Sequence, residues 1–182
     1  MAPPLVVSFV GGERGIWQVD RQHAVTGPPL PVAGRVAVVE GDAVGDDAGV
    51  WVLRGTTSHE RYVERPEREA LVARQPPLRR PEATLAALIP ISKSPAWWDL
   101  TQEERRAVLE TRSRHIATGL ASLPAVARRL HHGRDQQEQF DFLTWFEFAP
   151  AAAEEFEDLV GRLRATEEWT YVDREIDLRL QR

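Results

Sequence analysis

The amino-acid sequence predicts an α+β protein in which helices cover one face of an antiparallel sheet. Two observations carry this prediction. The second half of the chain alternates apolar runs of strand length with two segments of helical periodicity. The first half adds four shorter apolar runs, separated by clusters of Gly, Pro and Asp. With 42% hydrophobic residues among 182, the chain is long and apolar enough to bury a core.

Six elements are expected in the second half, in the order strand, helix, strand, strand, helix, strand. They span residues 84–91, 101–120, 124–132, 140–148, 150–164 and 168–180. The first is a short, mostly apolar run. The second opens at a capping box, because Thr101 and Glu104 have the spacing that satisfies the first free N–H groups of a helix. Gly119 and Pro124 mark its end.

The third and fourth elements alternate in polarity on either side of a polar turn and therefore predict a hairpin. Pro150 opens the second helix, with Glu154 and Glu155 near its positive end. Ile176 and Leu178 alternate with polar residues in the last strand. This order of elements is the ferredoxin-like arrangement, which leaves one face of the sheet free to bind a ligand.

The first half resembles an abbreviated copy of the second. Its strands are expected at residues 6–10, 16–19, 35–40 and 50–54, and its one helix at residues 60–75. A Pro- and Arg-rich stretch over residues 75–81 is typical of a linker. We therefore expect an abbreviated N-terminal half over residues 1–75 and a C-terminal half over residues 82–182.

Charge and cysteine content exclude several classes of function. The formal net charge of -5 argues against a nucleic-acid partner, which needs clustered basic residues. The absence of cysteine excludes disulfides, thiolate zinc sites and iron–sulfur clusters. No stretch approaches the roughly 20 apolar residues of a membrane span. The start lacks the pattern of a secretory signal, so the cytoplasm is the expected location.

His115 is the histidine best placed for chemistry. It falls on the apolar side of its expected helix, whereas His131 and His132 are neighbours on a strand and point to opposite faces. Without thiols, any protein-bound metal must use histidine or carboxylate ligands. His115 is either such a ligand or a core histidine whose ring bonds a backbone carbonyl.

Arg128 stands out through the parity of its strand. Val126, Arg128 and Leu130 share one face. Arg129 and His131 share the other, so Arg128 lies on the apolar face and Arg129 on the polar one. A buried guanidinium is costly unless it is paired. Arg128 therefore either forms a salt bridge with a carboxylate or faces a cavity that binds an anion.

Several ordered motifs resemble those of the chlorite dismutases, in particular their short, dimeric branch. The resemblance is dense from about Gln75 to Leu180 and reaches into the first half at residues 53–55 and 58–65. The motifs are Lys93-Ser-Pro-Ala-Trp97-Trp98, Thr101-Gln-Glu-Glu-Arg-Arg106, Ser113-Arg-His115, Leu123-Pro-Ala-Val-Ala-Arg128, Phe140-Asp-Phe-Leu-Thr-Trp-Phe-Glu147 and Leu163-Arg-Ala-Thr-Glu-Glu-Trp-Thr-Tyr-Val172. Their order and spacing make this resemblance far more specific than any single motif.

The resemblance implies a haem b site in the C-terminal half. His115 would be the proximal ligand of the iron. Glu168, on the last strand, would accept the ring N–H of His115, with the neighbouring Glu167 left open as the alternative. Arg128 would be the distal arginine, and Gln75 would hold it in position.

Three further residues would line the haem under this resemblance, namely Ile89, Lys93 and Trp97. The implied architecture is a homodimer whose ferredoxin-like halves form a dimeric α+β barrel. The implied activity converts chlorite, a small anion, into chloride and dioxygen with formation of an O–O bond. Two alternatives remain: a coproporphyrin-haem decarboxylase of the same fold, or a haem-binding or haem-sensing module with peroxidase side activity.

Overall fold

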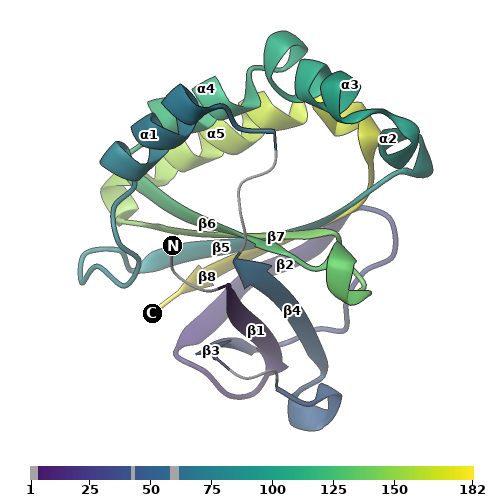
Figure 1. Cartoon of the computed structure of the whole chain (residues 1–182). Helices are drawn as coiled ribbons and strands as arrows, with labels where there is room; N and C mark the ends of the chain where they lie inside the picture. Colours follow the sequence, from purple (N-terminus) through teal and green to yellow (C-terminus); the bar gives the residue numbers. More distant parts are fainter. Residues whose placement is uncertain (1–3, 42–43, 58–61) are drawn as a thin grey trace.

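The computed structural model describes residues 4–41, 44–57 and 62–182, whose eight strands close into one antiparallel barrel with helices on one side (Figure 1). The strands are β1 (Leu5–Gly12), β2 (Trp17–Thr26), β3 (Arg35–Glu40), β4 (Trp51–Thr57), β5 (Leu85–Lys93), β6 (Val126–His132), β7 (Phe142–Phe148) and β8 (Val172–Gln181). All neighbouring pairs among them are antiparallel. The α+β class predicted from the sequence is confirmed.

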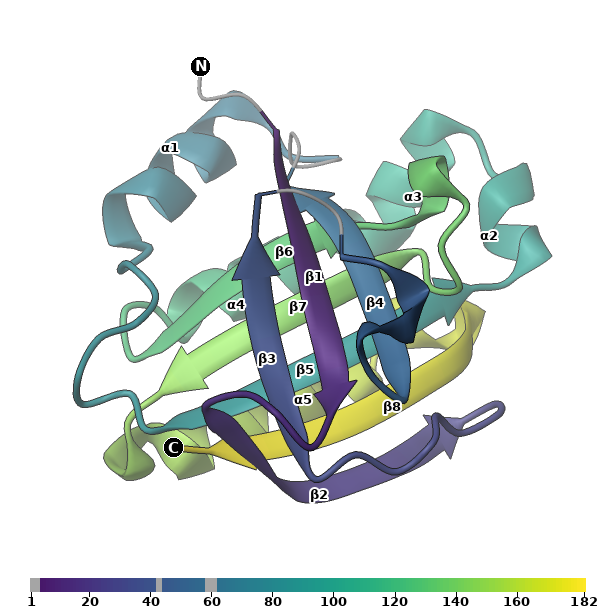
Figure 2. The same cartoon turned by 90° about the horizontal axis from the view of Figure 1, so that it is seen from below.

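Two groups of four strands repeat one arrangement. The first group has the spatial order β4-β1-β3-β2 and the second has β8-β5-β7-β6, so both follow the pattern fourth, first, third, second. Figure 2 shows strands of the first group in front of those of the second. The groups meet at two seams. The β2–β8 seam extends from Gln18 opposite Gln181 to Thr26 opposite Glu175, whereas the β4–β6 seam has Thr56 opposite His132 as its single described pair.

The main helices lie over the outer face of the second strand group (Figure 1). They are α1 (Arg65–Arg74), α2 (Pro95–Asp99), α3 (Gln102–Arg106), α4 (His115–Ala121) and α5 (Ala153–Arg164). The helix expected over residues 60–75 is thus present as α1, although residues 60 and 61 lie outside the described part. None of the described helices combines the length and the hydropathy that a membrane-spanning segment requires.

Alternation along β7 separates two hydrophobic layers. Leu143 and Trp145 belong to the core inside the barrel. Phe146 and Phe148 belong to the layer between the sheet and α5. There the ring of Phe156 stacks on Phe148 with 4.4 Å between ring centroids. The second strand group is therefore buried on both faces, which explains its nearly continuous apolar sequence. The expectation that the face away from the helices is free to bind a ligand is wrong, because that face packs against the first strand group inside the barrel.

The prediction of one continuous helix over residues 101–120 is wrong. Its start is confirmed, because Thr101 and Glu104 form the capping box at the head of α3. The chain then widens into a π-helix over Ala107–Arg112, and Arg114 adopts left-handed backbone with φ of 51°. α4 begins anew at His115. The apolar pattern continues across this break and therefore gives no sign of it.

The last strand begins later than predicted. Residues 168–171 form a turn of 3-10 helix (η5), and β8 starts only at Val172. The N–H groups of Trp169 and Thr170 donate to the carbonyls of Thr166 and Glu167 three positions earlier. These bonds prolong the helical backbone beyond α5. Glu168 therefore lies on a helical turn and not on a strand.

The parity of β6 is confirmed for Arg128, but the opposite face was misjudged. Ala127 and His131 are both 0% exposed, so that face is the inside of the barrel and not a polar surface. Arg129 leaves this face near the barrel end, where its guanidinium lies 2.6 Å from a carboxylate oxygen of Glu40. Its Nε donates to Nε2 of His131 at 3.1 Å. A carboxylate on β3, far away in sequence, makes this placement possible.

Candidate active site

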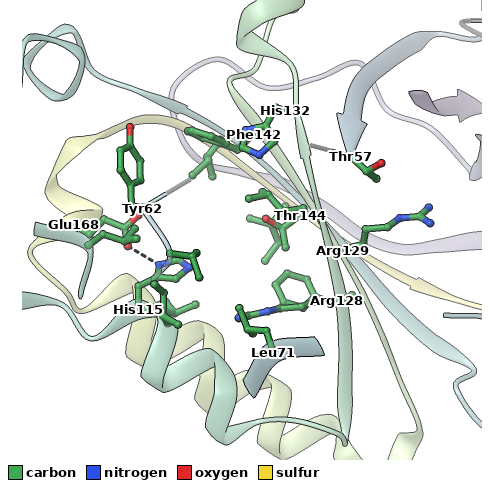
Figure 3. Close-up of a pocket in the computed structure, with 18 of the residues that line it drawn as sticks. Thr57, Tyr62, Leu71, His115, Arg128, Arg129, His132, Phe142, Thr144 and Glu168 are labelled. Carbon is green, nitrogen blue, oxygen red and sulfur yellow. Dashed lines mark hydrogen bonds and ion pairs between the residues drawn. The ribbon is translucent and has the colours of Figure 1, made fainter. Parts of the chain in front are cut away.

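A cavity of about 560 Å³ lies between the helices and the outer face of the second strand group (Figure 3). It brings together all the site residues expected from the sequence: Gln75, Ile89, Lys93, Trp97, His115, Arg128 and Glu168. Its other walls are largely apolar and include Leu71, Ile91, Leu109, Ile116, Phe142 and Phe146. A concave, mainly apolar pocket with a few converging polar groups is typical of a cofactor or substrate site.

His115 is the first residue of α4, and the backbone around it is firmly held. Arg114 turns the chain into the helix. The Glu110 carboxylate accepts hydrogen bonds from the backbone N–H groups of Ile116 at 2.7 Å and Ala117 at 3.3 Å. A carboxylate in this place satisfies free N–H groups and favours the positive end of the helix. The imidazole therefore projects into the cavity from a capped helix start (Figure 3).

Glu168 orients the imidazole of His115. One carboxylate oxygen of Glu168 lies 2.6 Å from Nδ1 of His115, and this glutamate side chain is only 3% exposed. The backbone N–H of Glu168 donates to Oγ of Ser113 at 2.9 Å, which ties η5 to the start of α4. Glu167 instead pairs with Arg112 at 2.9 Å and is 41% exposed. Of the two neighbouring glutamates, Glu168 is the one that contacts His115.

A buried lysine completes this polar cluster. Nζ of Lys93 lies 2.8 Å from the other carboxylate oxygen of Glu168, and its side chain is 2% exposed. It also stands 4.5 Å from the ring centroid of Trp97 and 5.6 Å from that of Trp169, within the range of cation–π attraction. The backbone N–H of Lys93 donates to a carboxylate oxygen of Asp141 at 2.7 Å. Glu168 is thus bound at both oxygens.

These contacts set the ionisation of the cluster. Burial opposes the charge on Glu168, but the attraction of His115 and Lys93 outweighs it and lowers the pKa of Glu168 to about 2. For Lys93 the balance is reversed. Burial lowers the pKa of Lys93, and the nearby Glu168 and Asp141 offset only part of that effect. Glu168 therefore remains a carboxylate at neutral pH.

The cluster suits a histidine that binds a metal through its second ring nitrogen. Because Nδ1 of His115 faces a carboxylate, Nε2 remains for a metal, and such a partner raises the basicity of the ring. Within the described ranges, no group of three or more His, Cys, Asp or Glu could hold a metal ion alone. Trp97 lines the same cavity, while its Nε1 is buried and has no hydrogen-bond partner among the described residues.

Arg128 enters the same cavity from β6 (Figure 3). Its guanidinium lies against Gly119 of α4. Gln75, at the end of α1, donates its side-chain amide to the backbone carbonyl of Arg128 at 2.8 Å. Gln75 therefore holds Arg128 through its main chain. A guanidinium in an apolar pocket is a strong binding partner for a small anion.

Sequence reasoning missed the residues that support this arrangement, namely Glu110, Ser113, Gly119 and Asp141. Glu110 gave no recognisable signal, because a capping carboxylate usually lies three positions from the N–H groups that it satisfies. Here the separations are six and seven positions, since the π-helix and Arg114 intervene. Ser113 and Asp141 act on residues that only the fold brings near.

The fold and the pocket together define a class of protein: an α+β barrel enzyme with a carboxylate-bound histidine and an arginine in one apolar cavity. The sequence profile of the family described as "Chlorite dismutase" matches residues 48–181, which is well over half of the chain. The chain therefore belongs to the chlorite dismutase family of enzymes.

Individual relatives agree with this assignment. A dimeric chlorite dismutase from Nitrobacter winogradskyi is 55% identical with a TM-score of 0.90, over 97% of this chain and 99% of that one. A mutant chlorite dismutase from Candidatus Nitrospira defluvii, in complex with cyanide, shares the fold with a TM-score of 0.70 at 19% identity, over 98% and 90%. A chlorite dismutase from Ideonella dechloratans is 39% identical over 62 residues, which span 34% of this chain but 20% of that protein.

Proposed function

We propose that this protein is a haem b enzyme that converts chlorite into chloride and dioxygen. The observation that carries the proposal is the convergence of the His115–Glu168 pair and Arg128 on one apolar cavity. High similarity to a dimeric chlorite dismutase over nearly the whole chain supports it. When bound, haem b would supply the redox chemistry of the reaction.

The residues on the helix side hold the cofactor. His115 would bind the iron through Nε2, while Glu168 accepts the ring N–H at Nδ1, which fixes the tautomer and the orientation of the ring. Lys93 balances the buried charge of Glu168. Trp97 and Ile89 form part of the cavity wall that would face the cofactor.

The residues on the sheet side bind and retain the anion. Arg128 attracts chlorite by charge and then retains the chlorine-containing fragment until the two oxygen atoms have joined. Gln75 keeps the backbone of Arg128 in place. The apolar walls exclude water, which strengthens the interaction between Arg128 and the anion. Both oxygen atoms of the product come from one chlorite, so the reaction needs no other reductant or oxidant.

The test is to purify the protein with haem, record its absorption spectrum and follow dioxygen with an electrode after adding chlorite. We expect one dioxygen released for each chlorite consumed. A protein that binds no haem would overturn the proposal. Haem binding without dioxygen release would also overturn it, and would favour a decarboxylase of this fold or a haem-binding module.

We also propose that the chain forms a homodimer and consists of two ferredoxin-like halves, residues 1–75 and 82–182. The dimeric state described for the relative from Nitrobacter winogradskyi supports the first part, and the repeated strand order of the two groups supports the second. Light scattering after gel filtration is expected to give twice the 20.5 kDa of one chain. A mass of one chain would contradict the dimer.

A further inference from the structure

Gly119 and Arg128 make an unusually close contact for residues on a helix and a strand. A Cβ atom built on Gly119 would overlap the terminal guanidinium nitrogens of Arg128. The guanidinium therefore packs directly on the backbone of α4. No other residue type at position 119 leaves that space, because every other side chain begins with a Cβ atom.

The contact links the two sides of the candidate site. Gly119 lies four positions after His115 on α4, so both face the same way and are separated by about 6 Å along the helix axis. Arg128 lines the cavity, whereas Gly119 is not among its lining residues. The guanidinium thus covers Gly119 at the border of the cavity, one helical turn from the imidazole.

A second helical glycine, Gly161, has no such contact. Gly161 lies inside α5, and a Cβ atom built there would meet nothing within 4 Å. Alanine could therefore replace Gly161 at no steric cost. The replacement should also stabilise α5, because glycine destabilises a helix interior relative to alanine. At Gly119 the same replacement meets Arg128. The two positions therefore form a matched pair for experiment.

We propose that Gly119 is a positioning residue for Arg128: its missing side chain lets the guanidinium rest on the helix that carries His115. This contact sets where the cation stands relative to His115, and so relative to an anion bound in the cavity. The consequence for the anion rests on the proposed function. The contact itself does not, so the two can be tested separately.

The contact is tested by thermal unfolding of four proteins: Gly119→Ala, Gly161→Ala, Arg128→Ala and the double variant Gly119→Ala/Arg128→Ala. Gly161→Ala is expected to raise the Tm by about 2–4 °C through its helix propensity. In Gly119→Ala the flexible end of Arg128 has to move off the helix, so this variant is expected to gain less in Tm than Gly161→Ala. In the Arg128→Ala background, where the space is free, Gly119→Ala should gain the full increase. An equal change in Tm from Gly119→Ala in both backgrounds would overturn the proposal.

The consequence is tested with cyanide as the anion probe, titrated optically into the haem-loaded proteins. Gly119→Ala should weaken cyanide binding about 10-fold, the effect of losing one charge-assisted contact. Gly161→Ala should leave the Kd within about twofold. Adding Gly119→Ala to Arg128→Ala should change the Kd less than about twofold. Equal weakening in both backgrounds, or none with Arg128 present, would overturn the role of Gly119. A protein that binds no haem would overturn the proposed function, while the unfolding data would still decide the contact.

Discussion

Nδ1 of His115 and a carboxylate oxygen of Glu168 lie 2.6 Å apart, although 53 positions separate the two residues along the chain. The carboxylate is buried, and η5 holds it at the start of α4. Its neighbour Glu167 faces away from the cavity and pairs with an arginine near the surface. Two adjacent glutamates therefore have separate tasks, and each can serve as the control for the other.

Glu168→Gln is expected to weaken haem binding or activity by about 10–100-fold, because the amide is a poorer partner for the imidazole N–H. Haem affinity is measured by titration of the haem-free protein, and the spectrum reports the strength of the axial ligand. Glu167→Gln is the matched control and should leave both unchanged. Equal effects of the two substitutions would contradict the assignment of Glu168.

Lys93→Met is expected to lower the free energy of unfolding by roughly 3 kcal/mol, because it leaves the buried Glu168 with one partner fewer. Urea denaturation measures the change. The double variant Lys93→Met/Glu168→Gln should lose less than the two single losses combined, since it removes the unbalanced charge as well. Additive losses would show that the Lys93–Glu168 pair has no energetic coupling.

Arg128→Ala is expected to lower the rate of dioxygen release and to let hypochlorite escape from the pocket. The physical reason is the loss of the cation that retains the chlorine-containing fragment. Dioxygen is followed with an electrode, a dye that reacts with hypochlorite detects the leak, and the haem spectrum records bleaching. Arg162→Ala, which removes an exposed arginine of α5 that does not line the cavity, is the control. Full activity and lifetime without Arg128 would contradict its role.

The buried side chain of His131 should make the free energy of unfolding depend on pH. It is 0% exposed, its Nδ1 donates to the Leu143 carbonyl and its Nε2 accepts from Arg129. Burial lowers the pKa of His131 from 6.5 to about 4. As pH falls below 6.5, the unfolded chain therefore binds a proton that the folded protein resists.

The stabilising effect of neutral His131 is fully present above pH 6.5 and is lost as the pH falls toward 4. The expected loss is roughly 3 kcal/mol of unfolding free energy over this range. Urea denaturation at several pH values measures it. His131→Gln should flatten the dependence relative to wild type, whereas His23→Gln, at an exposed position of β2, should not. An unchanged slope in His131→Gln would refute this origin.

The sequence predicted those parts of the site that depend on local pattern. Strand parity placed Arg128 on the cavity face of β6, because alternation is a property of the extended backbone alone. Motif order identified His115, and the cavity contains it. The two candidate glutamates could not be separated by spacing, since the choice depends on how η5 turns after α5.

Other features depend on contacts that no local pattern records. The break before His115 involves a π-helix and the Glu110 carboxylate, which caps the N–H of Ile116 six positions later. The placement of Arg129 depends on Glu40, which lies 89 positions earlier. The packing of Arg128 on Gly119 requires the distance between a helix and a strand, which tertiary structure alone determines.

The two seams that join the strand groups of the barrel differ in length. Along β2–β8 the two strand groups are joined over most of the strand length, whereas among the described residues β4 and β6 meet at one pair. Amide protons near the weaker seam should therefore exchange with solvent earlier than those of β2 and β8. Thr57, Arg129, Leu130 and His132 lie at this weaker edge and also line the cavity. Local opening of the barrel is therefore expected at the β4–β6 seam, on the side where the cavity lies.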